Sequence, residues 1–381
     1  DPTGFDYWNI LVGQGDYYNP IFIDNGEKRQ IEGYATNITT DLALDWLDNK
    51  RDKSKPFCLL LHHKAPHRTW MPDTKDLRLF NQSKFTLPAN FYDSYETREA
   101  AAVQDMTIDK TMRMGYDLKM FASKEEEEKD LSIKRMTKAQ RQAYMTFYDS
   151  IHRDFQSKKL SGKALVEWKY QRYMQDYLAT AASLDRNIGR TLDYLDKHDL
   201  SKNTIVIYVS DQGFYMGEHG WFDKRFMYEE SFRTPMVLRY PGVIKSGSVN
   251  SNMVMNLDIG PTLLDAAGIK IPNDMQGKSF LPLIKGSAKK GRDAMYYHYY
   301  ENGEHSVSPH FGISTGRYKL IRFYTRVSGW ELFDLEKDPS EMKNIYGQKG
   351  YEKVTADLKK KLAQLIDQYE DEEAKKILVI H

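Results

Sequence analysis

Polar side chains that could carry out chemistry follow two short apolar runs of the chain. Asp211 and Gln212 follow residues 205–209 after one intervening serine. A carboxylate beside an amide oxygen suits a hard cation such as calcium better than zinc. His67 comes soon after residues 57–61, and a histidine can protonate a leaving group near neutral pH. A capping or turn role for Asp211, and a turn hydrogen bond for His67, are the alternative interpretations.

A cation lies a little further along the chain. Lys224 ends the glycine-punctuated stretch 217–224, and a lysine near a metal can bind a tetrahedral anion and stabilise its transition state. An ordinary surface lysine is the alternative. His62, His63 and His67 also permit a zinc site, which ranks lower because no fitting carboxylate or cysteine partner lies near them.

The apolar pattern predicts strands that alternate with helices. Short buried strands are expected at 57–61, 205–209 and 236–238, and helices at 36–48, 173–195 and 258–267. This alternation implies an α/β fold with a central, mostly parallel sheet sandwiched by helices. Ligands of such sheets bind beyond the carboxyl ends of the strands. We therefore expect the four polar residues His67, Asp211, Gln212 and Lys224 to meet at one rim of the sheet.

The character of the chain changes after Gly286. Residues 296–300 and 311–324 are aromatic and alternating, as in antiparallel strands, and residues 354–369 are typical of a closing amphipathic helix. We predict a catalytic domain over 1–286, with a charged helical insert at about 93–165. A smaller α+β subdomain with an antiparallel sheet is expected over 287–381.

Composition excludes several classes of function. Lys and Arg total 55 against 54 Asp and Glu, a net charge of +1, so bulk charge recruits neither nucleic acid nor a membrane surface. No apolar run approaches the roughly 18–20 residues of a membrane-spanning helix. Cys58 is the single cysteine, which excludes an internal disulfide framework, and its apolar neighbours predict a small buried core residue.

Together these residues resemble the sulfatase family of the alkaline-phosphatase-like superfamily. The resemblance covers nearly the whole chain apart from the charged insert. Gly15–Asn19 and Gly33–Tyr34 look like N-acetylglucosamine-6-sulfatases and their bacterial polysaccharide-degrading relatives. The short motifs that carry the family resemblance are, in order, 4–8, 63–67, 210–213, 217–220, Lys224, 228–229, 234–235, 258–264, 331–335 and 338–339.

The resemblance implies a role for each matching residue. Asp211 and Gln212 would be two ligands of one calcium ion, with Gln212 standing where many relatives have Asn or His. Lys224 would contact the sulfate and its bridging oxygen. His67 would protonate the leaving group.

Three further histidines are candidate substrate-binding residues. His219 lies in the same loop as Lys224 and would line the pocket. His305 and His310 lie between aromatic strands of the smaller domain and are suited to contact the sugar. Their alternative interpretation is that of ordinary loop histidines.

Sulfatases use a formylglycine made from Cys or Ser in a C/S-x-P/A-x-R motif, and this motif is absent here. The paired aspartates that complete the family's metal site are absent as well. We expect these residues upstream of Asp1 and therefore interpret the chain as the larger, C-terminal part of the enzyme, inactive by itself. The leader peptide is also outside the sequence, and we expect a periplasmic or secreted protein, lysosomal if eukaryotic.

The resemblance implies a sulfuric ester hydrolase that acts on a sulfated sugar or glycosaminoglycan, with 6-O-sulfated N-acetylglucosamine preferred. Three alternatives stay open. The first is an iduronate-2-sulfatase-like enzyme, because the 63–67 and 217–220 motifs are also similar to that group. The second is a phosphate- or phosphonate-ester hydrolase of the same superfamily, and the third is an inactive glycan-binding fragment.

Overall fold

The computed structural model describes residues 1–303 and 305–380. Contacts divide the chain into two compact units. The first consists of Asp1–Leu87 and Ile108–Lys202, and the second of Pro88–Thr107 and Asn203–His381. The boundary expected near residue 286 stays a prediction.

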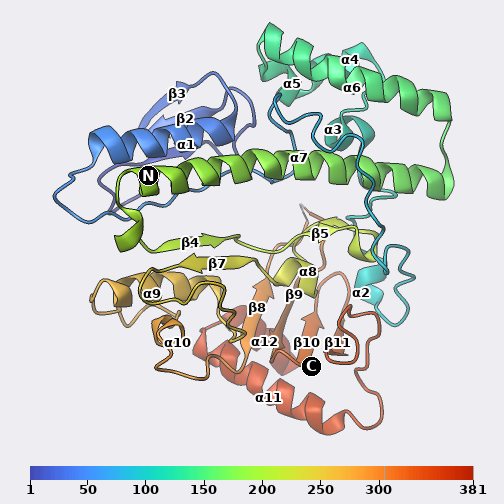
Figure 1. Cartoon of the computed structure of the whole chain (residues 1–381). Helices are drawn as coiled ribbons and strands as arrows, with labels where there is room; N and C mark the ends of the chain where they lie inside the picture. The colour runs from blue at the N-terminus through green and yellow to red at the C-terminus, as the bar shows by residue number, and fades with distance from the viewer. Residues whose placement is uncertain (304, 381) are drawn as a thin grey trace. The chain divides into compact units, whose positions relative to one another are not determined.

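The first unit combines a small sheet with helices (Figure 1). Its three strands are antiparallel in the order β1-β2-β3. α1 packs along α7, and a short π-helical turn follows α1. The elements are β1 (Asn9–Leu11), β2 (Ile21–Asp24), β3 (Glu27–Gln30), α1 (Ala35–Asp45), α3 (Met114–Leu118), α4 (Lys124–Lys129), α5 (Leu131–Arg135), α6 (Lys138–Lys158) and α7 (Gly162–Lys197).

α7 contains the helix expected at 173–195 and confirms it. Tyr173 and Leu184 are buried on its inner face, and the Tyr173 ring lies 4.5 Å from the ring of Trp70. The same face buries Lys169 and Asp176, so it is not purely apolar. These buried charges find partners in the segments that α7 supports.

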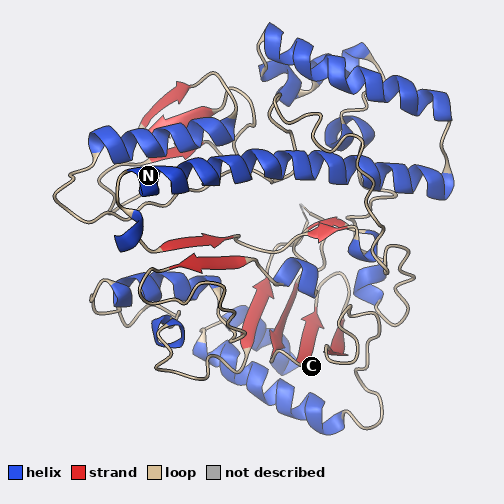
Figure 2. Ribbon diagram, viewed as in Figure 1, coloured by secondary structure: helices blue, strands red, loops and turns tan. Residues whose placement is uncertain are grey.

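The second unit is built around a larger sheet (Figure 2). β8, β9, β10 and β11 form an antiparallel sheet in the order β11-β10-β9-β8, which confirms the expected antiparallel sheet near the C-terminus. The elements are α2 (Glu99–Ala102), β4 (Val206–Val209), β5 (Tyr215–Met216), β6 (Phe222–Asp223), α8 (Glu229–Phe232), β7 (Met236–Arg239), α9 (Ile259–Ala266), α10 (Leu281–Ile284), β8 (Met295–Tyr299), β9 (His310–Ser314), β10 (Tyr318–Phe323), β11 (Gly329–Asp334), α11 (Glu352–Gln368) and α12 (Glu372–Ile380).

α11 covers one face of the β8–β11 sheet, as the closing helix was expected to do. Leu358, Leu362 and Ile366 lie at intervals of four on its buried side. They pack in one apolar cluster with Phe311 and Leu320 of the sheet. This packing fixes the strands that adjoin the candidate site.

Two expectations about strands need correction. β4 and β7 pair antiparallel, and no parallel pair joins strands within residues 1–303 and 305–380. Residues 210–235 connect them and contain the hairpin of β5 and β6 and the one-turn helix α8. Residues 57–61 form no strand, and Cys58 is exposed rather than buried. An apolar run is buried only where other segments cover it, and no described strand pairs with this one.

The described helices can be compared with the length and apolar character of a membrane-spanning helix. None of them combines the length and apolar character that crossing a bilayer requires.

Candidate active site

Asp211 and Gln212 follow the end of β4 after Ser210, as the sequence predicts. The Asp211 side chain is exposed, and its Oδ1 accepts hydrogen bonds from the Gln212 amide at 3.2 Å and the Ser210 hydroxyl at 3.3 Å. Asn256 Nδ2 donates to the Asp211 carbonyl at 2.6 Å, which ties the loop to the turn before α9. The carboxylate therefore projects from an anchored backbone.

Gly213 permits the close contact between this loop and α8. Its N–H donates to the Ser231 carbonyl at 2.9 Å. A Cβ at position 213 would lie 2.1 Å from the Glu230 carbonyl oxygen and 2.6 Å from that of Arg233. Because both atoms belong to the backbone, only glycine fits here.

Lys224 follows a hairpin formed by β5 and β6. Its side chain is 13% exposed, and its Nζ lies 3.8 Å from Asp223 Oδ1 and 6.0 Å from the centre of the Phe214 ring. Arg225 NH1 donates to the other oxygen of Asp223 at 2.6 Å. Two cations, Lys224 and Arg225, thus contact one carboxylate at the end of β6.

His219 is fully buried in a charged network of the second unit. Its Nδ1 lies 2.7 Å from Asp93 Oδ2, and Asp93 Oδ1 accepts a 2.6 Å hydrogen bond from Arg98. Burial acts to raise the pKa of Asp93, but the hydrogen bonds from His219 and Arg98 outweigh it and lower the pKa to about 2. The ionised carboxylate therefore accepts the Nδ1 proton of His219.

This network anchors the turn before Lys224. The Tyr95 hydroxyl donates to the His219 carbonyl at 2.5 Å, and burial lowers the pKa of His219, which keeps its ring neutral. On the far side of the ring, Nε2 lies 3.8 Å from Glu230 Oε2. A ring without exposed surface supports a structural role, and its burial argues against the predicted contact with substrate.

Two more buried carboxyl groups adjoin these residues. Burial raises the pKa of Glu331 to about 8, and Glu331 Oε2 accepts a 2.8 Å hydrogen bond from the Tyr228 hydroxyl. Burial also raises the pKa of Glu341 to about 7, although Lys319 Nζ lies 2.8 Å from its Oε1. Sequence reasoning included Tyr228 and Glu331 in family motifs but gave no signal for their pairing.

His67 lies in the first unit, in an irregular segment before α3. Its ring is half-buried, and Nδ1 lies 2.7 Å from the Arg68 carbonyl oxygen. A carbonyl oxygen only accepts, so Nδ1 carries a proton. Asp211, Gln212 and Lys224 belong to the second unit, and the approach of His67 to them stays a prediction.

The remaining two histidines differ in exposure. His305 is exposed, and its Nδ1 lies 3.3 Å from Glu301 Oε2, so it can still reach a ligand. His310 is fully buried, with Nδ1 2.7 Å from the Ser308 carbonyl and Nε2 accepting from the Met227 amide at 3.2 Å. Both nitrogens of His310 are occupied, which argues against its predicted contact with a sugar.

The donor set after β4 is compatible with calcium but incomplete by itself. Within the described residues, no group of three His, Cys, Asp or Glu side chains is placed to hold a metal ion. Asp211 nevertheless offers an exposed carboxylate. Together with the Gln212 amide oxygen, it supplies the hard oxygen donors that calcium prefers.

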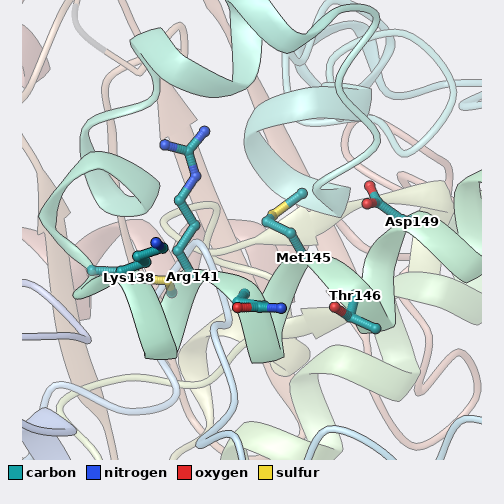
Figure 3. A pocket seen from close by; sticks show the side chains of 7 residues that line it. Lys138, Arg141, Met145, Thr146 and Asp149 are labelled. Carbon is teal, nitrogen blue, oxygen red and sulfur yellow. The ribbon is translucent and has the colours of Figure 1, made fainter.

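A pocket of about 430 Å³ lies along α6, and its lining residues are far in the sequence from the candidate site residues (Figure 3). Lys138, Arg141, Met145 and Asp149 line it. Arg141 NH2 donates to Glu127 Oε1 at 2.7 Å, and Lys124 Nζ contacts the other oxygen of the same carboxylate. No predicted site residue lines this pocket.

Family models and known proteins match most of this chain, including the candidate site residues. A family model described as Sulfatase matches residues 3–269, and one described as N-sulphoglucosamine sulphohydrolase, C-terminal, matches residues 217–368. An N-acetylglucosamine-6-O-sulfatase of Bacteroides thetaiotaomicron is 48% identical over 97% of this chain and 69% of its own length. An arylsulfatase of Clostridium perfringens is 30% identical over 89% of this chain and 59% of its own.

Solved structures agree with these matches. A protein solved in complex with its substrate D-glucosamine-2-N,6-O-disulfate superposes with a TM-score of 0.94 and 47% identity. That match covers 98% of this chain and 78% of the other. It confirms the expected fold class, the alkaline-phosphatase-like α/β fold with a C-terminal antiparallel sheet.

Proposed function

Because the chain belongs to the sulfatase family, we propose that the protein removes sulfate from a sulfated sugar, with 6-O-sulfated N-acetylglucosamine as its preferred substrate. The observation that carries this proposal is the similarity of 97% of this chain to an N-acetylglucosamine-6-O-sulfatase, of which the match covers 69%. The anchored loop after β4 and the two cations at the end of β6 support it, because a sulfate ester needs positive charge around its oxygens.

Asp211 and Gln212 would hold a calcium ion, which when bound supplies positive charge beside the sulfate oxygens. Lys224 would bind the sulfate through its ammonium group. The same group would stabilise negative charge that develops on the bridging oxygen as its bond to sulfur breaks. The hydrogen bonds that fix the Asp211 backbone and the Lys224 hairpin would hold both groups ready for the substrate.

His67 would deliver the proton that the departing sugar oxygen needs. Because Nδ1–H donates to the Arg68 carbonyl, Nε2 of a protonated His67 is the atom that would donate. The proton would move from Nε2 to the sugar oxygen as the bond from that oxygen to sulfur breaks.

No C/S-x-P/A-x-R motif stands among the 381 residues. We therefore place the formylglycine, and the other calcium ligands, in residues encoded outside them. We also place the protein in the periplasm or outside the cell, where sulfated glycans are met, and fractionation of the source cells tests that placement.

The test measures sulfate released by protein made from its complete coding sequence. Substrates are 6-O-sulfated N-acetylglucosamine, 2-O-sulfated iduronate and a phosphate monoester. We expect the first to be preferred, and Lys224→Ala to lower kcat/KM by about 100-fold. Lys245→Ala serves as the control, because Lys245 is exposed and lies outside the site. Preference for either other substrate would refute the proposed specificity, and normal turnover by Lys224→Ala would refute the role of that lysine.

A further inference from the structure

The irregular segment His67–Pro72 is held by side chains rather than by a helix or a strand. Each of its six carbonyl groups accepts a hydrogen bond from a side chain, and five of the six are bound by only four residues. The bonds are Tyr17 Oη to His67 O at 2.6 Å, His67 Nδ1 to Arg68 O at 2.7 Å, Lys119 Nζ to Thr69 O at 2.7 Å and to Trp70 O at 2.9 Å, Tyr34 Oη to Met71 O at 2.9 Å, and Tyr18 Oη to Pro72 O at 2.7 Å.

The four residues Tyr17, Tyr18, Tyr34 and Lys119, here called the carbonyl clamp, are all buried. Water therefore competes little for the carbonyls that they bind. Burial raises the pKa of Tyr17 and of Tyr18, so their hydroxyls stay protonated and remain donors. A backbone whose carbonyls are held in this way has little freedom to shift.

Lys119 ties the segment to the helices of the first unit. It follows α3 in the left-handed conformation, with φ of 59°, which turns its side chain back toward Thr69 and Trp70. Its ammonium group also lies 3.4 Å from Asp176 Oδ2 on α7. Through these bonds α7 supports the backbone that follows His67.

Asp117 of α3 adds a second hold on the same segment. Its two carboxylate oxygens accept bonds from Arg68 Nε at 2.6 Å and Arg68 NH2 at 2.8 Å. This bidentate pair fixes the Arg68 side chain. The Arg68 carbonyl is the acceptor of His67 Nδ1, so the orientation of the imidazole depends on a backbone that is fixed on both sides.

We propose that the carbonyl clamp positions His67 for protonation of the leaving group. This inference rests on the proposed function and deepens it. It gives a physical reason for the motifs Gly15–Asn19 and Gly33–Tyr34, whose tyrosines act on catalysis through the backbone of another segment. The clamp residues are positioning residues, and His67 is the group that meets the substrate.

The test uses two variants that remove one donor each and keep the shape of the side chain. Tyr17→Phe removes the hydroxyl that binds the His67 carbonyl, and Lys119→Met removes the ammonium group. The chain offers matched controls in the same unit. Tyr170 Oη binds the Thr86 carbonyl at 3.0 Å, and Lys169 Nζ binds the carbonyls of Asp109 at 2.7 Å and Met112 at 3.2 Å. Tyr170→Phe and Lys169→Met therefore remove equivalent bonds from backbone that does not carry His67.

Each variant, made from the complete coding sequence, is assayed on two substrates that differ in leaving group. A sugar sulfate releases an alkoxide that needs a proton, whereas 4-nitrophenyl sulfate releases a stable phenolate. We expect His67→Ala to lower kcat on the sugar sulfate by about 100-fold or more, and the clamp variants to lower it by about tenfold or more. On the aryl sulfate, all three should stay within about threefold of the wild type.

A second measurement is the pH dependence of kcat on the sugar sulfate. A weakened bond from His67 Nδ1 to the Arg68 carbonyl stabilises the imidazolium less, so the alkaline limb should move to lower pH in the clamp variants and not in the controls. Equal losses on both substrates with an unmoved limb, or losses no larger than those of the controls, would overturn the inference alone. A wild-type enzyme that releases no sulfate from any sugar would overturn the proposed function, and the inference with it.

Discussion

Replacement of Glu331 by glutamine should make the protein more stable at neutral pH. Glu331 is buried on β11, and burial raises its pKa from the ordinary value of 4.5 to about 8. The folded protein therefore keeps a proton that the unfolded chain releases between these two pH values. Stability from the protonated carboxyl is complete below pH 4.5 and is lost as the pH rises toward 8.

The size of the effect follows from the two pKa values. A pKa that differs by one between the folded and the unfolded protein corresponds to about 1.4 kcal/mol of folding stability. A rise of the Glu331 pKa from 4.5 to about 8 therefore corresponds to about 5 kcal/mol in total, of which about 3 kcal/mol is lost by pH 7. Glutamine cannot ionise, and its carbonyl oxygen can still accept the hydrogen bond from Tyr228. We therefore expect Glu331→Gln to match the wild type near pH 4.5 and to exceed it by up to about 3 kcal/mol at pH 7.

Urea denaturation followed by tryptophan fluorescence at several pH values between 4.5 and 8 measures this difference. Glu336→Gln is the control, because the Glu336 side chain is 66% exposed and adjoins the same strand. Two results would refute the reasoning: a variant whose stability falls with pH as steeply as that of the wild type, or one that is less stable than the wild type at pH 7.

The remaining predictions concern two contacts behind the site. Gly213→Ala should destabilise the protein by about 2 kcal/mol or more in a denaturation experiment, because the new methyl group clashes with the Glu230 carbonyl. Gly189→Ala in α7 is its control: no atom lies within 4 Å of the new Cβ, so this change should be neutral or stabilising. Asp93→Asn should destabilise by about 3 kcal/mol, because the buried Arg98 loses its carboxylate. Asp293→Asn, which breaks an exposed pair with Lys361, should change stability by less than about 1 kcal/mol, and equal effects of these two asparagine variants would contradict the argument.

The sequence predicts the helices and strands whose apolar residues recur at regular intervals within one segment. The spacing of Tyr173 and Leu184 indicates a helix with one buried face, and α7 has that face. The alternating aromatic residues of 296–300 and 311–324 likewise correspond to β8, β9 and β10. Such patterns need no knowledge of the partner segment.

Contacts between residues that lie far apart in the sequence cannot be predicted from such local patterns. The Asp93 and His219 side chains bond across 126 positions of the sequence, and no spacing rule connects them. The tyrosines of the carbonyl clamp stand in recognisable motifs, but their acceptors are backbone carbonyls, which every residue type carries. The prediction of a buried Cys58 is wrong for a related reason, because an apolar run does not reveal whether another segment covers it.

The exposure of Cys58 has a practical consequence. It is the only thiol among the 381 residues, so within them a maleimide dye or a spin label has one site of attachment. That position precedes His67 by nine residues in the same unit. A label at Cys58 can therefore report on the backbone that leads to His67, the residue proposed to protonate the leaving group.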